Sequence, residues 1–235
     1  MMVNSHLRSV SCTLIAALWL SLAAIGGFAP VHGAGDGDAG GAADSDIRIL
    51  AFGDSLTAGY GLDPGEGFTE QLETWLGARL AVPVGVVNGG VSGDTSTGGR
   101  SRLDWALAPI KNGAPDLVIL ELGANDGLRG IDPAITRTNI DAMVASLSGR
   151  GIPVLLTGML APPNLGPEYA AAFNTIYRDV AAKYGVRLYP FFLDGVAADS
   201  ALNQSDGIHP NADGVKIIVE RLGPAVLSML DAGGR

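Results

Sequence analysis

The sequence is poor in the residues that bind transition metals or form disulfides. Its 235 residues include one cysteine, Cys12, and three histidines. Cys12, His6 and His32 all lie in a segment that resembles a cleavable leader, so the remaining chain keeps only His209. A chain without cysteine excludes disulfides, thiolate chemistry and cysteine-based zinc sites. A single histidine also falls short of the usual zinc ligand sets, and we expect no metal site.

Positive charge is scarce as well. The chain has 15 Lys and Arg against 24 Asp and Glu, which gives a formal net charge of −9. Proteins bind nucleic acids mainly through Lys and Arg, so we expect no nucleic-acid partner. The acidic balance favours solubility and carries no information on fold, and the sequence leaves the oligomeric state undetermined.

The N-terminal segment has the pattern of a secretory signal peptide. Arg8 is followed by an uncharged, largely apolar stretch over 11–29, and Val31-His32-Gly33 offers small residues for cleavage. The alternative is an uncleaved membrane anchor, since the apolar stretch is near the lower length limit for spanning a bilayer. The small-residue exit favours cleavage, and hence an exported, periplasmic or secreted protein with no stable membrane insertion after signal removal.

Composition then changes twice along the chain. Residues 34–45 are rich in Gly, Ala and Asp and lack apolar periodicity, which predicts a flexible linker between a signal peptide at 1–33 and a single folded domain at 46–232.

Apolar periodicity in that domain alternates between strand-like and helix-like segments. Strands are predicted at 47–52, 84–88, 116–122, 153–157 and 187–189, and helices at 68–80, 96–110, 133–147, 168–184 and 213–230. Regular alternation of this kind predicts an α/β fold with five parallel strands and helices on both faces, a three-layer α/β/α arrangement.

Short polar segments follow the predicted strands. They are Gly53-Asp54-Ser55, the glycine-rich 89–95, and 123–126 with Asn125, while Asp206 and His209 precede the last helix. Because ligands of parallel sheets bind at the carboxyl ends of the strands, we expect all four segments to meet at one rim.

These residues suit acyl transfer by a serine nucleophile. Ser55 would attack, and His209 would take its proton and later deliver it to the leaving group. Asp206 lies three residues before His209, so that its carboxylate can orient the imidazole from the same turn. The backbone N–H groups of Ser55 and Gly93 and the amide of Asn125 are the candidate donors to an oxyanion.

Each segment also has a simpler interpretation as a turn or helix cap. Asp54, Asp94 and Asp126 suit such loop-fixing roles better than chemistry, because Asp readily bonds nearby backbone groups. The glycine-rich segment lacks the Walker lysine and the spaced glycines of nucleotide sites. Among residues near the rim, Leu128, Asn164 and Ile208 are candidate contacts to a substrate. Asn164 lies in a proline-rich loop that could form one wall of the site.

Four motifs in order resemble the SGNH (GDSL-type) serine hydrolases. They are Gly53-Asp54-Ser55-Leu56, Gly93-Asp94-Thr95, Gly-x-Asn-Asp at 123–126 and Asp-x-x-His at 206–209. Longer matches around them resemble the exported branch that contains arylesterases and the multifunctional acyl-CoA thioesterase I/protease I/lysophospholipase. The resemblance implies a flavodoxin-like sheet, a triad of Ser55, Asp206 and His209, an oxyanion hole of Ser55, Gly93 and Asn125, and no cofactor or metal.

The function expected from this resemblance is hydrolysis of small-molecule or lipid esters. Aryl and fatty-acyl esters are the expected substrates, with acyl thioesters and lysophospholipids open because they use the same acyl-transfer chemistry. Two alternatives remain at this point: a carbohydrate acetylesterase on the same scaffold, and a non-catalytic binding module of the cell envelope.

Overall fold

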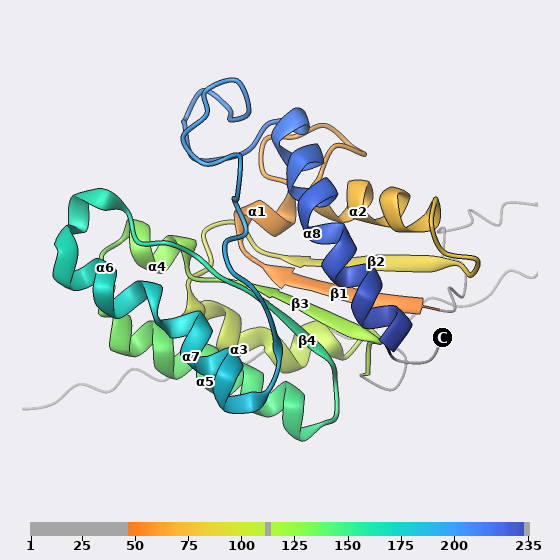
Figure 1. Ribbon diagram of the computed structural model, residues 1–235, viewed down its shortest axis with the longest axis horizontal. Helices are drawn as coiled ribbons and strands as arrows, with labels where there is room; N and C mark the ends of the chain where they lie inside the picture. The colour runs from red at the N-terminus through yellow and green to blue at the C-terminus, as the bar shows by residue number, and fades with distance from the viewer. Residues whose placement is uncertain (1–46, 111–113, 233–235) are drawn as a thin grey trace, which may run out of the picture. The chain divides into compact units, whose positions relative to one another are not determined.

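A five-stranded parallel sheet forms the centre of the folded region. The computed structural model describes residues 47–110 and 114–232 (Figure 1). The strands lie in the order β2-β1-β3-β4-β5, and every neighbouring pair is parallel. Their bounds are β1 Ile47–Gly53, β2 Val84–Gly90, β3 Leu117–Glu121, β4 Val154–Thr157 and β5 Arg187–Tyr189. The predicted α/β class and five-stranded sheet are confirmed.

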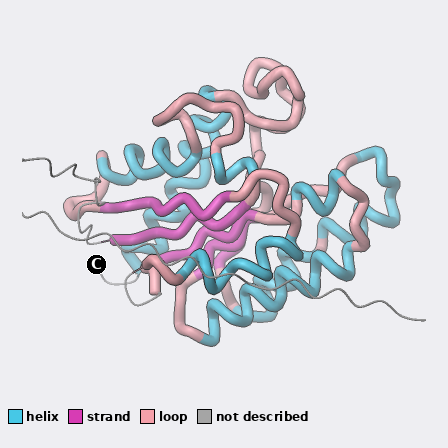
Figure 2. Tube along the Cα trace, turned by 180° about the vertical axis from the view of Figure 1, so that it is seen from behind, coloured by secondary structure: helices cyan, strands magenta, loops and turns pink. Residues whose placement is uncertain are grey.

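Helices cover both faces of this sheet. Figures 1 and 2 show α2 and α8 on one face, and α3, α5 and α7 on the other, so the layers are α/β/α as predicted. The helices are α1 Ser55–Ala58, α2 Phe68–Gly77, α3 Ser96–Leu107, α4 Ala124–Leu128, α5 Pro133–Gly149, α6 Gly166–Asn174, α7 Ile176–Tyr184 and α8 Ala212–Ala232, with a 3₁₀ turn, η2, at Pro163–Leu165.

The central strands are buried on both sides. All five residues of β3 and all four of β4 are buried, and both are apolar except at their last residue. Strands covered by helices on both faces have near-continuous apolar sequences, which is the pattern seen here. The sheet therefore forms a rigid platform whose strand ends set the positions of the loops.

One predicted helix is two helices in the structure. The segment expected to be helical over 168–184 divides at Thr175 into α6 and α7. Side chains at this joint bond to other groups: Asn174 accepts from the backbone N–H of Ala161, and Thr175 accepts from Arg137 and donates to the carbonyl of Ala172. Such side-chain bonds compete with regular helical structure, which apolar periodicity does not reveal.

The carboxyl ends of the strands lie in a single register row. Gly90, Gly53, Glu121, Thr157 and Tyr189 pair in turn across the sheet, and each is the last residue of its strand. Loops that follow this row therefore begin from one edge, which is where the four polar segments were expected to meet.

The predicted leader and linker, with Cys12, His6 and His32, lie outside the described residues. Within the ranges that are described, no helix is both long and apolar enough to cross a bilayer.

Candidate active site

Ser55 is the first residue of α1, directly after the central strand β1. The residue before it, Asp54, accepts the backbone N–H of Leu56 at 3.0 Å and so caps this short helix. Ser55 is 9% exposed. A turn between a buried strand and a capped helix thus presents the hydroxyl at the rim of the sheet.

Asp206 and His209 form a turn that holds the imidazole in one orientation. One carboxylate oxygen of Asp206 accepts the backbone N–H groups of Ile208 and His209, each at 3.0 Å, and the other lies 2.6 Å from Nδ1 of His209. Gly207 has a φ of +75°, a conformation that favours glycine. These bonds lower the pKa of Asp206 to about 2, with the bond to the His209 ring as the largest cause.

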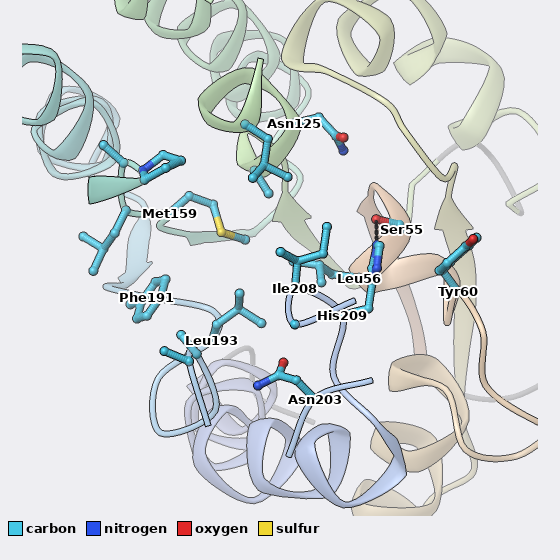
Figure 3. Close-up of a pocket in the computed structure, with 18 of the residues that line it drawn as sticks. Ser55, Leu56, Tyr60, Asn125, Met159, Phe191, Leu193, Asn203, Ile208 and His209 are labelled. Atoms are coloured by element: carbon cyan, nitrogen blue, oxygen red, sulfur yellow. Dashed lines mark hydrogen bonds between the residues drawn. The ribbon is translucent and has the colours of Figure 1, made fainter. Parts of the chain in front are cut away.

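His209 reaches Ser55 across 154 positions of sequence. Its Nε2 lies 2.9 Å from the Ser55 hydroxyl oxygen (Figure 3). An ionised carboxylate only accepts hydrogen bonds, so Asp206 requires the proton on Nδ1 and leaves Nε2 of the neutral ring as an acceptor for the hydroxyl. An imidazole in this state and at this distance can take the proton of an attacking hydroxyl.

Tyr60 covers another side of the imidazole. The two ring centroids are 4.7 Å apart at an angle of 40°, and Figure 3 shows Tyr60 beside the Ser55–His209 pair. Tyr60 lies just beyond the end of α1. Sequence analysis did not identify it as a site residue, because neither charge nor the apolar pattern distinguishes it there.

The candidate oxyanion donors Ser55, Gly93 and Asn125 line one cavity. Gly93 has a φ of +83°, and its carbonyl accepts from Arg129 at 2.8 Å, which fixes the peptide that follows it. The Asn125 amide nitrogen donates to Asp54 at 3.1 Å. An amide nitrogen carries two hydrogens, so this bond orients the group and leaves one hydrogen for a ligand.

Two buried carboxyl groups lie behind Ser55. Asp54 is fully buried, and burial raises its pKa to about 6 although bonds from Leu56 and Asn125 oppose the shift. Glu121, also fully buried, accepts from the hydroxyl of Thr57 at 2.8 Å. Burial, together with the charge of Asp54, raises the pKa of Glu121 well above its ordinary value. Sequence analysis missed Glu121, although a carboxylate that ends an apolar strand was a usable signal.

Arg102 holds the ends of β1 and β2 together from α3. Its guanidinium donates to the carbonyl oxygens of Gly53 and Gly89, each at 2.8 Å, and to the carboxylate of Asp94 at 2.5 Å. It also lies over the ring of Phe52, 4.2 Å from the centroid. This arginine, which the sequence patterns did not single out, thus braces the strand ends that lead to Ser55 and Gly93.

Asp126 fixes the loop after β3. Its carboxylate accepts the backbone N–H of Ser96 at 2.7 Å, the hydroxyl of Ser96 at 2.5 Å and that of Thr136 at 2.9 Å. The group is fully buried. Its bonds connect α4 with the beginnings of α3 and α5, which is a structural task.

A cavity of about 470 Å³ opens beside Ser55 and His209. It has the size of typical small-molecule pockets. Two of the predicted substrate contacts, Leu128 and Ile208, line it. The third residue lies elsewhere: Asn164 is exposed on η2 and is not among the described residues that line the cavity. The 3₁₀ turn directs Pro163 toward the cavity and leaves Asn164 to solvent.

Apolar side chains from the loops after β4 and β5 form the far wall. Figure 3 shows Met159, Phe191 and Leu193 there, opposite Tyr60. Asn203 also contributes to this wall. Within the described ranges, no group of three or more His, Cys, Asp or Glu side chains is placed to hold a metal ion.

Known proteins match this chain over most of its length. Residues 51–217 match the model of the GDSL-like Lipase/Acylhydrolase family. The chain is 42% identical to Esterase TesA of Pseudomonas aeruginosa over 77% of this chain and 89% of the relative. It is 36% identical to Thioesterase 1/protease 1/lysophospholipase L1 of Escherichia coli K12, over 73% and 79%.

Solved structures give the same result. The crystal structure of AlinE4, an SGNH-hydrolase family esterase, superposes with a TM-score of 0.65 at 46% identity and covers 77% of this chain and 95% of that one. The family match spans most of the chain, and the relatives are esterases that share its fold. The chain therefore belongs to the GDSL-like lipase/acylhydrolase family of SGNH hydrolases and is a serine esterase.

Proposed function

We propose that the enzyme hydrolyses esters through an acyl-enzyme on Ser55. The hydroxyl oxygen attacks the ester carbonyl while His209 takes its proton. The tetrahedral intermediate collapses, the bond to the leaving oxygen breaks, and His209 returns the proton to that oxygen. Water then attacks the acyl-enzyme by the same route, which releases the acid and restores Ser55. The observation that carries this proposal is the bonded series from Asp206 through His209 to Ser55 at the cavity.

Asp206 is the carboxylate that orients the base in this scheme. It lies on the Nδ1 side of His209 and its low pKa keeps it ionised over the working range. Asp126 is assigned no such role, because Ser96 and Thr136 occupy its oxygens.

The oxyanion of the intermediate is held by the backbone N–H groups of Ser55 and Gly93 and by the Asn125 amide. Two observations support this: all three residues line the same cavity, and Asn125 donates one amide hydrogen to Asp54, which leaves the other for the oxyanion. Donors fixed in this way lower the barrier because they need no reorganisation when charge develops.

The cavity supports aryl and fatty-acyl esters as substrates. Its wall near Ser55 carries Leu128 and Ile208, and its far wall carries Met159 and Phe191. Apolar walls of this kind favour apolar acyl or aryl groups over sugars. Acyl thioesters and lysophospholipids offer the same carbonyl chemistry and are included as lipid substrates; no nucleic acid takes part.

We further propose that the protein is exported. Residues 1–33 act as a signal peptide and 34–45 as a linker, and the domain occupies 46–232 without stable membrane insertion. The cationic start, the apolar stretch and the small residues at 31–33 support this. Mass measurement of the protein recovered from the producing cells tests it: an N-terminus near Ala34 agrees, and a retained leader contradicts it.

The central experiment measures hydrolysis of p-nitrophenyl esters from acetate to palmitate. Wild type is compared with Ser55→Ala and with Ser101→Ala, which removes an exposed serine of α3. We expect Ser55→Ala to lose at least about 10⁴-fold in kcat and Ser101→Ala to match wild type. Full activity in Ser55→Ala would refute the proposal. An acetylated sugar is assayed beside these esters, and a preference for it over every p-nitrophenyl ester would replace the lipid-ester assignment with a carbohydrate acetylesterase.

A further inference from the structure

The proposed nucleophile and base come from segments far apart in sequence and must stay aligned through the reaction. Ser55 leads α1, whereas His209 lies in a loop before α8. The hydrogen bond between them cannot provide this alignment, because it changes partners in each half-reaction. Other contacts must hold the two segments together.

Gln204 makes such contacts with its side chain. The amide nitrogen donates to the carbonyl oxygen of Tyr60 at 2.7 Å and to that of Pro210 at 2.9 Å. Both partners are carbonyl oxygens, which only accept, so the nitrogen must be the end of the amide that faces them. Both amide hydrogens therefore bridge the segment after α1 to the residue that follows His209.

The backbone of Gln204 is bonded to the same loop. Its N–H donates to the carbonyl of His209 at 2.7 Å, and its carbonyl accepts from Gly207 at 2.9 Å. The side-chain oxygen lies against Gly61, where an added Cβ would be 2.3 Å from it. Close packing on one side and hydrogen bonds on the other leave this side chain a single position.

The Tyr60 end of the bridge leads directly to the nucleophile. The backbone N–H of Tyr60 donates to the carbonyl of Ser55 at 3.1 Å, and its ring contacts the His209 ring. A continuous series of contacts thus runs from Ser55 through Tyr60 and Gln204 to Pro210, next to His209.

We propose that Gln204 is a positioning residue of the reaction: its amide ties Tyr60 to Pro210 and thereby keeps the His209 imidazole at bonding distance from the Ser55 hydroxyl. The inference rests on the proposed function, since it assumes that His209 acts on Ser55. Gln204 touches no reacting atom and is not among the described residues that line the cavity.

Gln71 provides a matched control. Its amide nitrogen also donates to two backbone carbonyl oxygens, of Glu66 at 2.8 Å and of Ala212 at 3.1 Å, and it also bridges distant segments. Its partners lie in the same two connecting segments but farther from the reacting groups: Glu66 is next to the start of α2, and Ala212 is the first residue of α8. Its two bonds reach neither Tyr60 nor Pro210. Gln204→Leu and Gln71→Leu therefore remove the same type of bridge at two different places.

The test compares kcat, KM and melting temperature for p-nitrophenyl butyrate in the two variants of the full chain. We expect Gln204→Leu to lose about 10- to 100-fold in kcat, as a small misplacement of a catalytic group does. Its KM should stay within about twofold, because Gln204 itself does not line the cavity. Gln71→Leu should keep wild-type kcat within about twofold with a similar fall in melting temperature.

Equal kcat in the two variants would overturn the inference, as would a loss in Gln204→Leu that appears in KM alone. Gln204→Glu serves as a second variant if Gln204→Leu does not fold, since it keeps the volume and replaces both donors. His209→Ala separates this inference from the proposed function: full activity there would remove the proposed base, whereas an inactive His209→Ala with a normal Gln204→Leu would remove only the role of Gln204.

Discussion

Two aspartates lie near the Ser55–His209 pair, and their surroundings shift their pKa values in opposite directions. Asp54 is fully buried and its pKa rises to about 6. Asp206 keeps 38% of its side chain exposed, and its pKa falls to about 2. Desolvation is the largest cause for Asp54, whereas the bond to His209 is the largest for Asp206.

The difference shows that hydrogen bonds and burial, rather than residue type, set the charge available at a site. Asp206 is ionised at every pH at which the enzyme would work, so it can hold His209 permanently. Asp54 changes its charge near pH 6, within the range of ordinary assays. Its bond to Asn125 is therefore the element of this site that we expect to respond to pH.

Three substitutions, of Asp206, Asp54 and Glu121, test this comparison. We expect Asp206→Asn to have the largest effect. The amide cannot hold His209 as a permanent acceptor does, and the ring loses its orientation and tautomer. We expect kcat to fall by about 10⁴-fold, the loss known for this change in a triad aspartate. Steady-state kinetics at pH 8 checks this, and a loss below tenfold would show that Asp206 is not the partner of His209.

Asp54→Asn should have an intermediate effect that depends on pH. At pH 8 the wild-type carboxylate accepts from Leu56 and Asn125, and we expect the variant to lose about tenfold in kcat through weaker bonds to these groups. Below pH 6 the wild-type group is itself protonated, so the ratio of wild type to variant should decrease. The pH profiles of both proteins test this, and a constant ratio from pH 5 to pH 8 would contradict the role of Asp54.

Glu121→Gln should have the smallest effect, and on stability rather than activity. An unfolded glutamate loses its proton at about pH 4.3, while the pKa of Glu121 in the folded state lies well above this value. Between the two values the unfolded state binds fewer protons, so wild-type stability falls as pH rises. We expect the variant's melting temperature to gain on wild type from pH 5 to pH 8. If the difference in melting temperature between the two proteins does not change with pH, the pKa of Glu121 is not raised by folding.

Much of this site could be predicted from the sequence because its parts are local patterns. The alternation of strand-like and helix-like apolar patterns predicted the strands, and parallel strands bring their carboxyl ends to one edge of the sheet. Ser55 and Gly93 follow two of those strands. The spacing of Asp206 and His209 matches a turn in which one carboxylate bonds both the backbone and the ring.

The remaining features depend on contacts between distant segments, which periodicity does not contain. Gln204 bonds a carbonyl 144 positions away, and Arg102 reaches Gly53 across 49. Glu121 ends an apolar strand, yet only the register with Gly53 shows that it lies behind Ser55. The exposure of Asn164 follows from a 3₁₀ turn of three residues, too short to have a period.

The most direct test of the account is to trap the acyl-enzyme. The purified enzyme is mixed with p-nitrophenyl butyrate, quenched in acid within the first turnovers, digested and examined by mass spectrometry. We expect one butyryl group on the peptide that contains Ser55, and none in Ser55→Ala or at any other serine. A butyryl group on a different residue, or an active enzyme that forms no acyl adduct, would contradict the assignment of Ser55 as the nucleophile.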